Sequence, residues 1–95
     1  MECRTIRFTG HALRRMFERE LDRDAVVRVI HRGEVIARYP DDRPFPSQLL
    51  LGFADDQAVH VMVAQNPDTR DCFVVTAYQP DPAVWSHDFK TRRTP

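Results

Sequence analysis

The stretch of residues 9–33, TGHALRRMFERELDRDAVVRVIHRG, decides which fold this chain can adopt. Apolar residues recur in it at the three- and four-residue spacing of an amphipathic helix, in two sets separated by Asp22. Thr9 and Asp22 are favourable N-cap residues ahead of these two sets, and Gly33 is well placed to end the second. The stretch therefore predicts two short helices, over residues 10–19 and 23–32.

Three polar side chains follow one line along the first of these helices. His11, Arg15 and Arg19 are four residues apart and so lie above one another on a single helical face. The neighbouring face is apolar, and we expect it to dock on a sheet through Leu13, Met16 and Phe17. The polar line would then offer an imidazole and two guanidiniums to an anion. The competing interpretation is that the arginines pair with acidic residues of the same helix and that His11 caps a backbone group.

Beyond residue 33 apolar and polar residues alternate, which is typical of strands. Four runs predict strands over residues 34–39, 47–53, 59–65 and 72–78, and residues 4–8 suit an extra short edge strand. Short links between the four runs favour an antiparallel meander. We therefore predict an α+β fold with both helices on one face of a four-stranded antiparallel sheet. After the helical part (1–33) and the meander (34–79), residues 80–95 are expected to form a tail in which Trp85 covers the sheet and which frays over residues 90–95.

Composition sets limits on the class of protein. The chain has 95 residues, which suits a single domain, and 14 basic against 14 acidic residues. It contains neither the run of about 20 apolar residues that a membrane span requires nor an N-terminal signal segment, so we expect a cytoplasmic protein. Cys3 and Cys72 are far apart and match no metal spacing, which predicts free thiols in a reducing compartment.

The zero net charge hides an uneven distribution. Residues 1–38 hold nine basic and six acidic residues, a net charge of +3, whereas residues 39–80 hold two and six, a net charge of −4. Thirteen of the 14 basic residues are arginines, and arginine makes bidentate contacts to phosphate. A globally basic nucleic-acid binder is excluded, but a local cationic face is not.

Several chemistries lack their motifs. The three glycines are scattered and build no phosphate-binding loop, and no serine sits in a G-x-S-x-G elbow. The four histidines show no metal-ligand spacing, so neither a metal nor a cofactor is predicted. Histidine, arginine and tyrosine side chains are what remains for chemistry.

His60 is unusual because it lies in the middle of a predicted strand. If its valine neighbours pack beneath the helices, His60 points to the opposite face, with Thr76 or Tyr78 as its cross-strand neighbour. A site joining the first helix to His60 then requires a location at the sheet edge. The alternative is a structural histidine bonded to a neighbouring hydroxyl or carbonyl group.

Taken in order, these motifs resemble the family known as domain of unknown function 4258. They comprise His11-Ala12, Arg15-Met16, Glu18-Arg19, Gly33-Glu34, the loop Tyr39-Pro-Asp-Asp-Arg-Pro, His60-Val61 and Thr76-Ala77-Tyr78, followed by Pro80 and Trp85.

The resemblance implies a RelE-like fold, as in the toxins of bacterial toxin-antitoxin pairs. It also implies a metal-independent endoribonuclease activity, RNA as a partner, and a cognate zinc-ribbon protein acting as antitoxin. The residues that match the polar signature are His11, Arg15, Arg19, His60 and Tyr78. Cleavage needs proton transfer and fixed cations, so we expect His60 with His11 or Tyr78 to be catalytic and both arginines to bind phosphate. The alternative is a non-catalytic module of the same fold that binds a partner protein.

Overall fold

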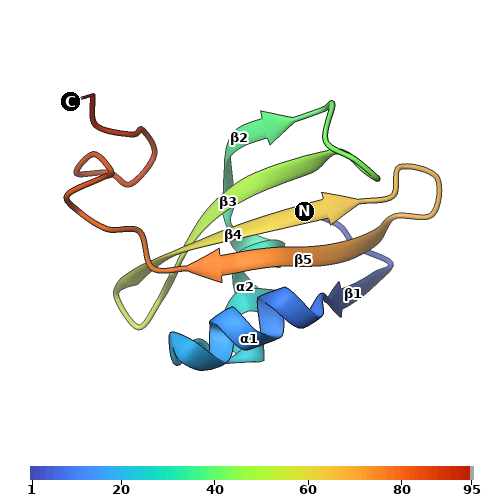
Figure 1. Ribbon diagram of the computed structural model, residues 1–95, viewed down its shortest axis with the longest axis horizontal. Coiled ribbons are helices and arrows are strands. Elements are labelled where there is room, and N and C mark those ends of the chain that lie inside the picture. Colours follow the sequence, from blue (N-terminus) through green and yellow to red (C-terminus); the bar gives the residue numbers. More distant parts are fainter. Residues whose placement is uncertain (95) are drawn as a thin grey trace.

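The computed structural model describes residues 1–94, which form two helices and five strands (Figure 1). In chain order these elements are β1 (Thr5–Phe8), α1 (Gly10–Glu18), α2 (Arg23–Arg32), β2 (Glu34–Tyr39), β3 (Ser47–Ala54), β4 (Gln57–Gln65) and β5 (Asp71–Tyr78). No helix in this part of the chain is long and apolar enough to cross a membrane.

Both helices begin where the sequence predicts. The Thr9 hydroxyl accepts a hydrogen bond from the backbone N–H of Ala12 at 3.0 Å, and the Asp22 carboxylate accepts one from that of Ala25 at 2.7 Å. These bonds satisfy backbone donors that a helix start leaves unpaired. Gly33 ends α2, although its φ of −72° is an ordinary value rather than left-handed. Glycine is needed there because a Cβ atom would lie 2.9 Å from the carbonyl oxygen of Leu51.

The predicted four-stranded antiparallel sheet is wrong. The sheet has five strands in the order β1-β5-β4-β3-β2, and β1 pairs with β5 in parallel, whereas the other pairs are antiparallel. The predicted α+β class and the position of both helices on one face of the sheet agree with the structure. The number of strands does not, because β1 belongs to the sheet and makes it mixed. Its sequence could not show this, because a run of four residues does not reveal which of two sheet edges it joins.

The start of β5 holds β1 in place. Thr5 is opposite Asp71 in the parallel register, and the Asp71 carboxylate accepts hydrogen bonds from the Thr5 hydroxyl at 2.7 Å and from Arg4 Nε at 3.0 Å. The bond from Arg4, followed by that from Thr5, holds the pKa of Asp71 well below its usual range. The carboxylate is therefore ionised at neutral pH, and its hydrogen bonds hold the segment around β1 against the start of β5.

A disulfide joins Cys3 to Cys72 next to this contact. The prediction of free thiols is therefore wrong. Cys3 and Cys72 are far apart in the sequence, but parallel pairing places Cys72 beside Ile6 and so brings the segment before β1 within reach of it. Free thiols therefore no longer support the expected location in a reducing compartment such as the cytoplasm.

The main core lies between the sheet and the two helices. Val59, Val61 and Val63 of β4 are 1% exposed or less and pack with Ala12 and Met16 of α1. The expectation that Leu13 and Phe17 dock on the sheet is wrong, because they are 44% and 87% exposed. Small Ala12 takes their place and lets α1 approach β5 closely.

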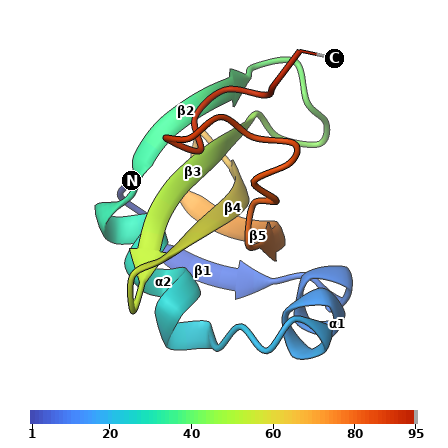
Figure 2. The same cartoon turned by 90° about the vertical axis from the view of Figure 1, so that its left-hand side faces the viewer.

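The far face of the sheet, opposite the helices, is covered at one end by the tail (Figure 2). Trp85 is 8% exposed, which confirms that it covers the sheet. The tail does not fray over residues 80–94. Its chain turns back, so that the backbone N–H of Arg93 donates to the carbonyl of Val84 at 2.7 Å and Trp85 bridges to Arg92. This segment builds a second, smaller core.

Candidate functional site

The far face holds a buried pair formed by His60 and Tyr78. The two residues are opposite each other in the β4–β5 register, and His60 Nδ1 lies 3.2 Å from the Tyr78 hydroxyl. His60 Nε2 lies 2.8 Å from the carbonyl oxygen of Phe89. The rings of His60 and Trp85 meet edge-on, with 4.5 Å between their centroids. The predicted orientation of His60 and its predicted neighbour Tyr78 are both confirmed.

These contacts fix the protonation of the pair. A carbonyl oxygen only accepts hydrogen bonds, so Nε2 of His60 carries the proton and donates it to Phe89. Nδ1 is then the acceptor for the Tyr78 hydroxyl. Burial lowers the pKa of His60, against the opposing effect of the bond to Phe89, and burial raises the pKa of Tyr78. Both groups are therefore neutral at pH 7.

The neutral state of His60 predicts a pH dependence of stability. Unfolding exposes the imidazole, whose pKa returns to about 6.5. Below that pH the unfolded chain binds a proton that the folded chain does not, so the free energy of unfolding falls as the pH drops from 7.5 to 5.5. The slope from this group is at most about 1.4 kcal/mol per pH unit.

Urea denaturation of the wild type and of His60→Gln at several pH values measures this effect. The Gln variant should show a flatter profile, whereas His87→Gln, in an exposed part of the tail, should keep the wild-type slope. Parallel profiles for the wild type and His60→Gln would contradict the neutral buried histidine.

Two guanidinium groups lie near the aromatic rings that contact His60. Arg19 donates from Nη1 to the carbonyl oxygen of Ala77 at 2.8 Å, and its Cζ atom lies 5.9 Å from the centroid of the Tyr78 ring. Arg92 reaches over Trp85, with its Cζ atom 5.5 Å from that ring centroid. After the dominant effect of burial, the positive charges of Arg92 and Arg19 oppose the rise in the pKa of Tyr78. Tyr78 is half-buried, with one guanidinium near its own ring and a second over the ring of Trp85.

The structure does not bring the whole predicted site together. His11 is exposed in the first turn of α1, and eight residues of helix separate it from Arg19, about 12 Å along the axis. Within residues 1–94 no hydrogen bond or ion pair joins His11 to His60 or Tyr78. Arg15 forms an ion pair with Glu18 at 3.2 Å, as the competing interpretation of this helix expected. The polar line of α1 is therefore divided, and Arg19 alone reaches the far-face pair.

Sequence reasoning missed the contribution of the tail. The acceptor for His60 is a backbone carbonyl, at Phe89, which no side-chain motif can reveal. Arg92 was expected to lie in a frayed end. The one available signal was the combination of Pro80 and Trp85, which marks a tail with an apolar anchor.

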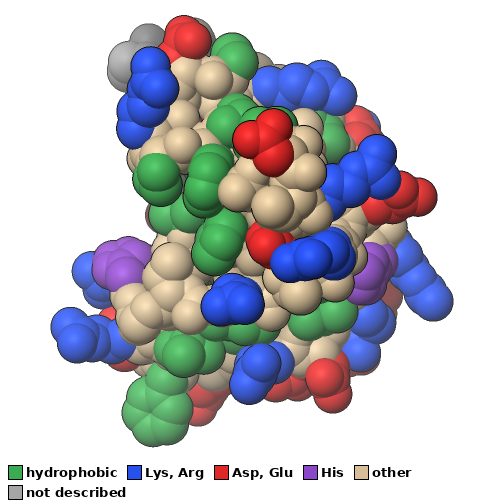
Figure 3. All heavy atoms as spheres, turned by 90° about the vertical axis from the view of Figure 1, so that its right-hand side faces the viewer, with side chains coloured by type: hydrophobic (Ala, Val, Ile, Leu, Met, Phe, Trp, Pro, Cys, Tyr) green, Lys and Arg blue, Asp and Glu red, His purple; other side chains and the backbone are tan. Residues whose placement is uncertain are grey.

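The surface at one end of the molecule agrees with the zero net charge. Figure 3 shows arginine and lysine side chains spread over this end, with acidic and apolar side chains among them. They do not merge into one basic patch on this face. Any contact with a polyanion there would be made by a few separate guanidiniums.

Fold and site together define a small α+β protein with a mixed five-stranded sheet and a buried histidine–tyrosine pair beneath its tail. Residues 1–94 contain no group of three or more His, Cys, Asp or Glu side chains arranged to hold a metal ion. The chain belongs to the family described as Domain of unknown function (DUF4258), whose model matches residues 8–79. No curated protein and no solved structure matches it. The matched region includes His60 and Tyr78 and ends before the tail that covers them.

Proposed function

We propose that this chain is a toxin-like, metal-independent endoribonuclease whose site is centred on Tyr78. The observation that carries the proposal is a half-buried phenol with the guanidinium of Arg19 near its ring and its hydroxyl bonded to the buried His60. A second guanidinium, that of Arg92, lies over the ring of Trp85, which also contacts His60. A phenol that is neutral at pH 7 can donate a proton, and fixed cations stabilise the charge that develops on a phosphate.

In the proposed reaction the 2′-oxygen of RNA attacks the adjacent phosphorus atom and the bond from phosphorus to the 5′-oxygen breaks. The Tyr78 hydroxyl turns from Nδ1 of His60 and gives its proton to the leaving 5′-oxygen, and Arg19 and Arg92 stabilise both the phosphate and the phenolate that forms. The proton of the 2′-hydroxyl passes to solvent, and the product is a 2′,3′-cyclic phosphate. His60 is fully buried, so we assign it the orientation of Tyr78 rather than direct proton transfer to RNA. Without a positioned base we expect slow cleavage.

Tyr78→Phe tests this function. The change removes one oxygen atom, and we expect cleavage of single-stranded RNA in the presence of EDTA to fall by about 100-fold, in line with the loss of a general acid. The rate is measured by gel analysis of labelled RNA. Tyr39→Phe is the matched control, because it removes the other tyrosine hydroxyl of the chain and should leave the rate unchanged.

Two results would contradict the proposed endoribonuclease activity. One is a folded wild type that leaves RNA intact, and the other is a Tyr78→Phe variant that cleaves as fast as the wild type. Arg19→Gln adds a further check, because it should slow cleavage without changing the bond between Tyr78 and His60.

A second candidate function is the binding of a partner protein, and exposed aromatic side chains favour it. Phe17 on α1 is 87% exposed and Phe53 on β3 is 59% exposed. Resemblance to toxin-antitoxin proteins suggests a zinc-ribbon partner encoded beside this chain. Co-expression with the product of the adjacent gene should yield a complex, and a chain that purifies alone would count against this function. Either function fits the cytoplasm, where the bond between Cys3 and Cys72 would have to persist against reducing thiols.

A further inference from the structure

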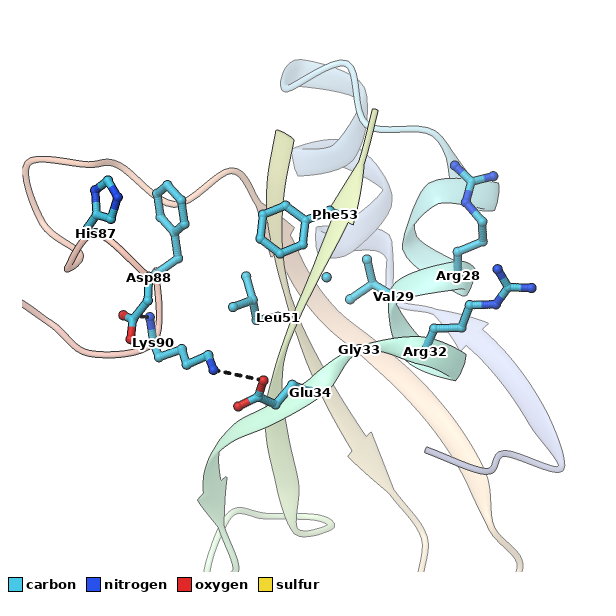
Figure 4. Close-up of a pocket in the computed structure, with 12 residues that line it drawn as sticks. Arg28, Val29, Arg32, Gly33, Glu34, Leu51, Phe53, His87, Asp88 and Lys90 are labelled. Atoms are coloured by element: carbon cyan, nitrogen blue, oxygen red, sulfur yellow. Dashed lines mark hydrogen bonds and ion pairs between the residues drawn. The ribbon is translucent and has the colours of Figure 1, made fainter. Parts of the chain in front are cut away.

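A groove lies where β2 stops short of the end of β3 (Figure 4). We call it the edge groove; it has a volume of about 730 Å³ and lies between α2 and the tail. Its lining includes Arg28 and Arg32 of α2, Gly52 and Phe53 of β3, and Lys90 of the tail. In Figure 4 Phe53 lies between the tail residues on one side and the two arginines on the other.

The inner wall of the edge groove is an unpaired strand edge. β2 begins at Glu34, opposite Leu51, so β3 residues 52–54 have β4 on one side only. On their other side, no strand of residues 1–94 pairs with them. Exposed backbone N–H and C=O groups of this kind are a template for another strand.

The two sides of the groove differ in chemistry. A Cβ atom on Gly52 would meet Val29, so Gly52 faces α2, and because side chains alternate along a strand, Phe53 faces the tail side. Arg28 and Arg32 are exposed on the α2 side, and neither takes part in an ion pair within the described residues. The positive charge of Lys90, by contrast, is paired with Glu34 at 3.1 Å. The α2 side is therefore cationic, whereas the tail side presents Phe53 beside the paired charges of Lys90 and Glu34.

We propose that the edge groove receives an extended segment of a partner protein, in which acidic and apolar residues alternate, as a strand added beside residues 52–54. In such a strand every second side chain points to α2, where carboxylates meet Arg28 and Arg32, and the others point to Phe53. The free backbone edge favours a peptide over a nucleic acid, which has no matching row of amide groups. This inference rests on the second candidate function, the binding of a partner protein, and does not depend on RNA cleavage.

A synthetic peptide tests the groove directly. The probe is a fluorescently labelled seven-residue peptide in which glutamate and valine alternate, and binding is measured by anisotropy at low salt. The double variant Arg28→Gln/Arg32→Gln should weaken binding about tenfold or more, and Phe53→Ala about fivefold. Leu13→Ala and Arg43→Gln, an exposed apolar residue and an exposed arginine outside the groove, are the matched controls and should bind as the wild type does.

Amide chemical shifts show whether the peptide pairs with the edge of β3. Peptide addition should shift the backbone N–H signals of residues 52–54, and a peptide with the same residues in separate glutamate and valine blocks should bind at least fivefold more weakly. Equal binding of the two peptides, no binding, or unshifted signals would overturn the proposal. So would an eight-nucleotide single-stranded RNA that displaces the peptide and loses affinity in the same arginine variant.

The two proposals fail separately. If the peptide binds but no complex forms with the product of the adjacent gene, that gene product is not the partner and the groove stands. If the complex forms but is unaffected by changes in Arg28, Arg32 and Phe53, the partner binds elsewhere and the edge groove is overturned.

Discussion

Replacing both Cys3 and Cys72 by serine should lower the free energy of unfolding by about 4 kcal/mol. The bond connects residues 69 apart in the sequence, and closing a loop restricts the unfolded chain by about 3 kcal/mol for 15 residues and about 4.7 for 100. For a domain of this size such a loss is a large part of the total stability. Urea denaturation of the oxidised wild type and the double variant measures the difference.

Dithiothreitol provides the matched comparison, since it should destabilise the wild type by a similar amount and leave the double serine variant unchanged. β1 should loosen first, because the disulfide holds the segment just before it. Faster hydrogen exchange in β1 than in β4 after reduction would show this. Equal unfolding midpoints for the oxidised wild type and the variant would contradict a stabilising bond.

His60→Ala should also cost about 4 kcal/mol, within the range for removing a large buried side chain. His60 is fully buried, so the change leaves a cavity, and it deprives the Tyr78 hydroxyl and the Phe89 carbonyl of their partners. The tail loses its main polar anchor at the same time. We therefore expect Trp85, the single tryptophan of the chain, to become more exposed, with a red shift of its fluorescence.

A comparison of variants separates the two roles of His60. His60→Gln keeps an amide donor and acceptor near the same place and should be less destabilising than His60→Ala. His87→Ala, in the exposed part of the tail, should change neither stability nor fluorescence. A His60→Ala protein that unfolds at the wild-type urea concentration, with Trp85 still buried, would contradict the anchoring role.

Local chemistry explains which parts of the fold were predictable. Thr9 and Asp22 accept bonds from backbone groups three residues ahead, so the sequence alone places both helix starts. Alternation places the strands and also the face of His60, because neighbouring side chains of a strand point in opposite directions. Each of these inferences needs only residues within one element.

Errors arose where distant segments meet. Pairing of β1 with β5 and the bond between Cys3 and Cys72 both join the first residues to residues 71–74, and no local pattern encodes such a contact. Leu13 and Phe17 were expected to be buried because they are apolar. The burial of Ala12, a small residue, shows that closeness of approach decides which edge of an apolar stripe meets the sheet.

The candidate site divides in the same way. Tyr78 was one of the two neighbours that strand alternation predicted for His60, and Arg19 followed from the four-residue spacing of the polar line on the first helix. Arg92 was not, since it reaches the site through a tail that turns back on itself. The complete burial of His60 is also a property of that tail, and it moves the proposed chemistry from His60 to Tyr78.

The pairing of β1 with β5 has a consequence for biosynthesis. Thr5 leaves the ribosome long before Asp71, its partner in the sheet, has been synthesised. β1 therefore stays unpaired until β5 has emerged. Contacts between such distant residues slow folding, because the chain must close a long loop before it gains their stabilisation. We therefore expect the pairing of β1 with β5 to be a late step in the folding of the domain.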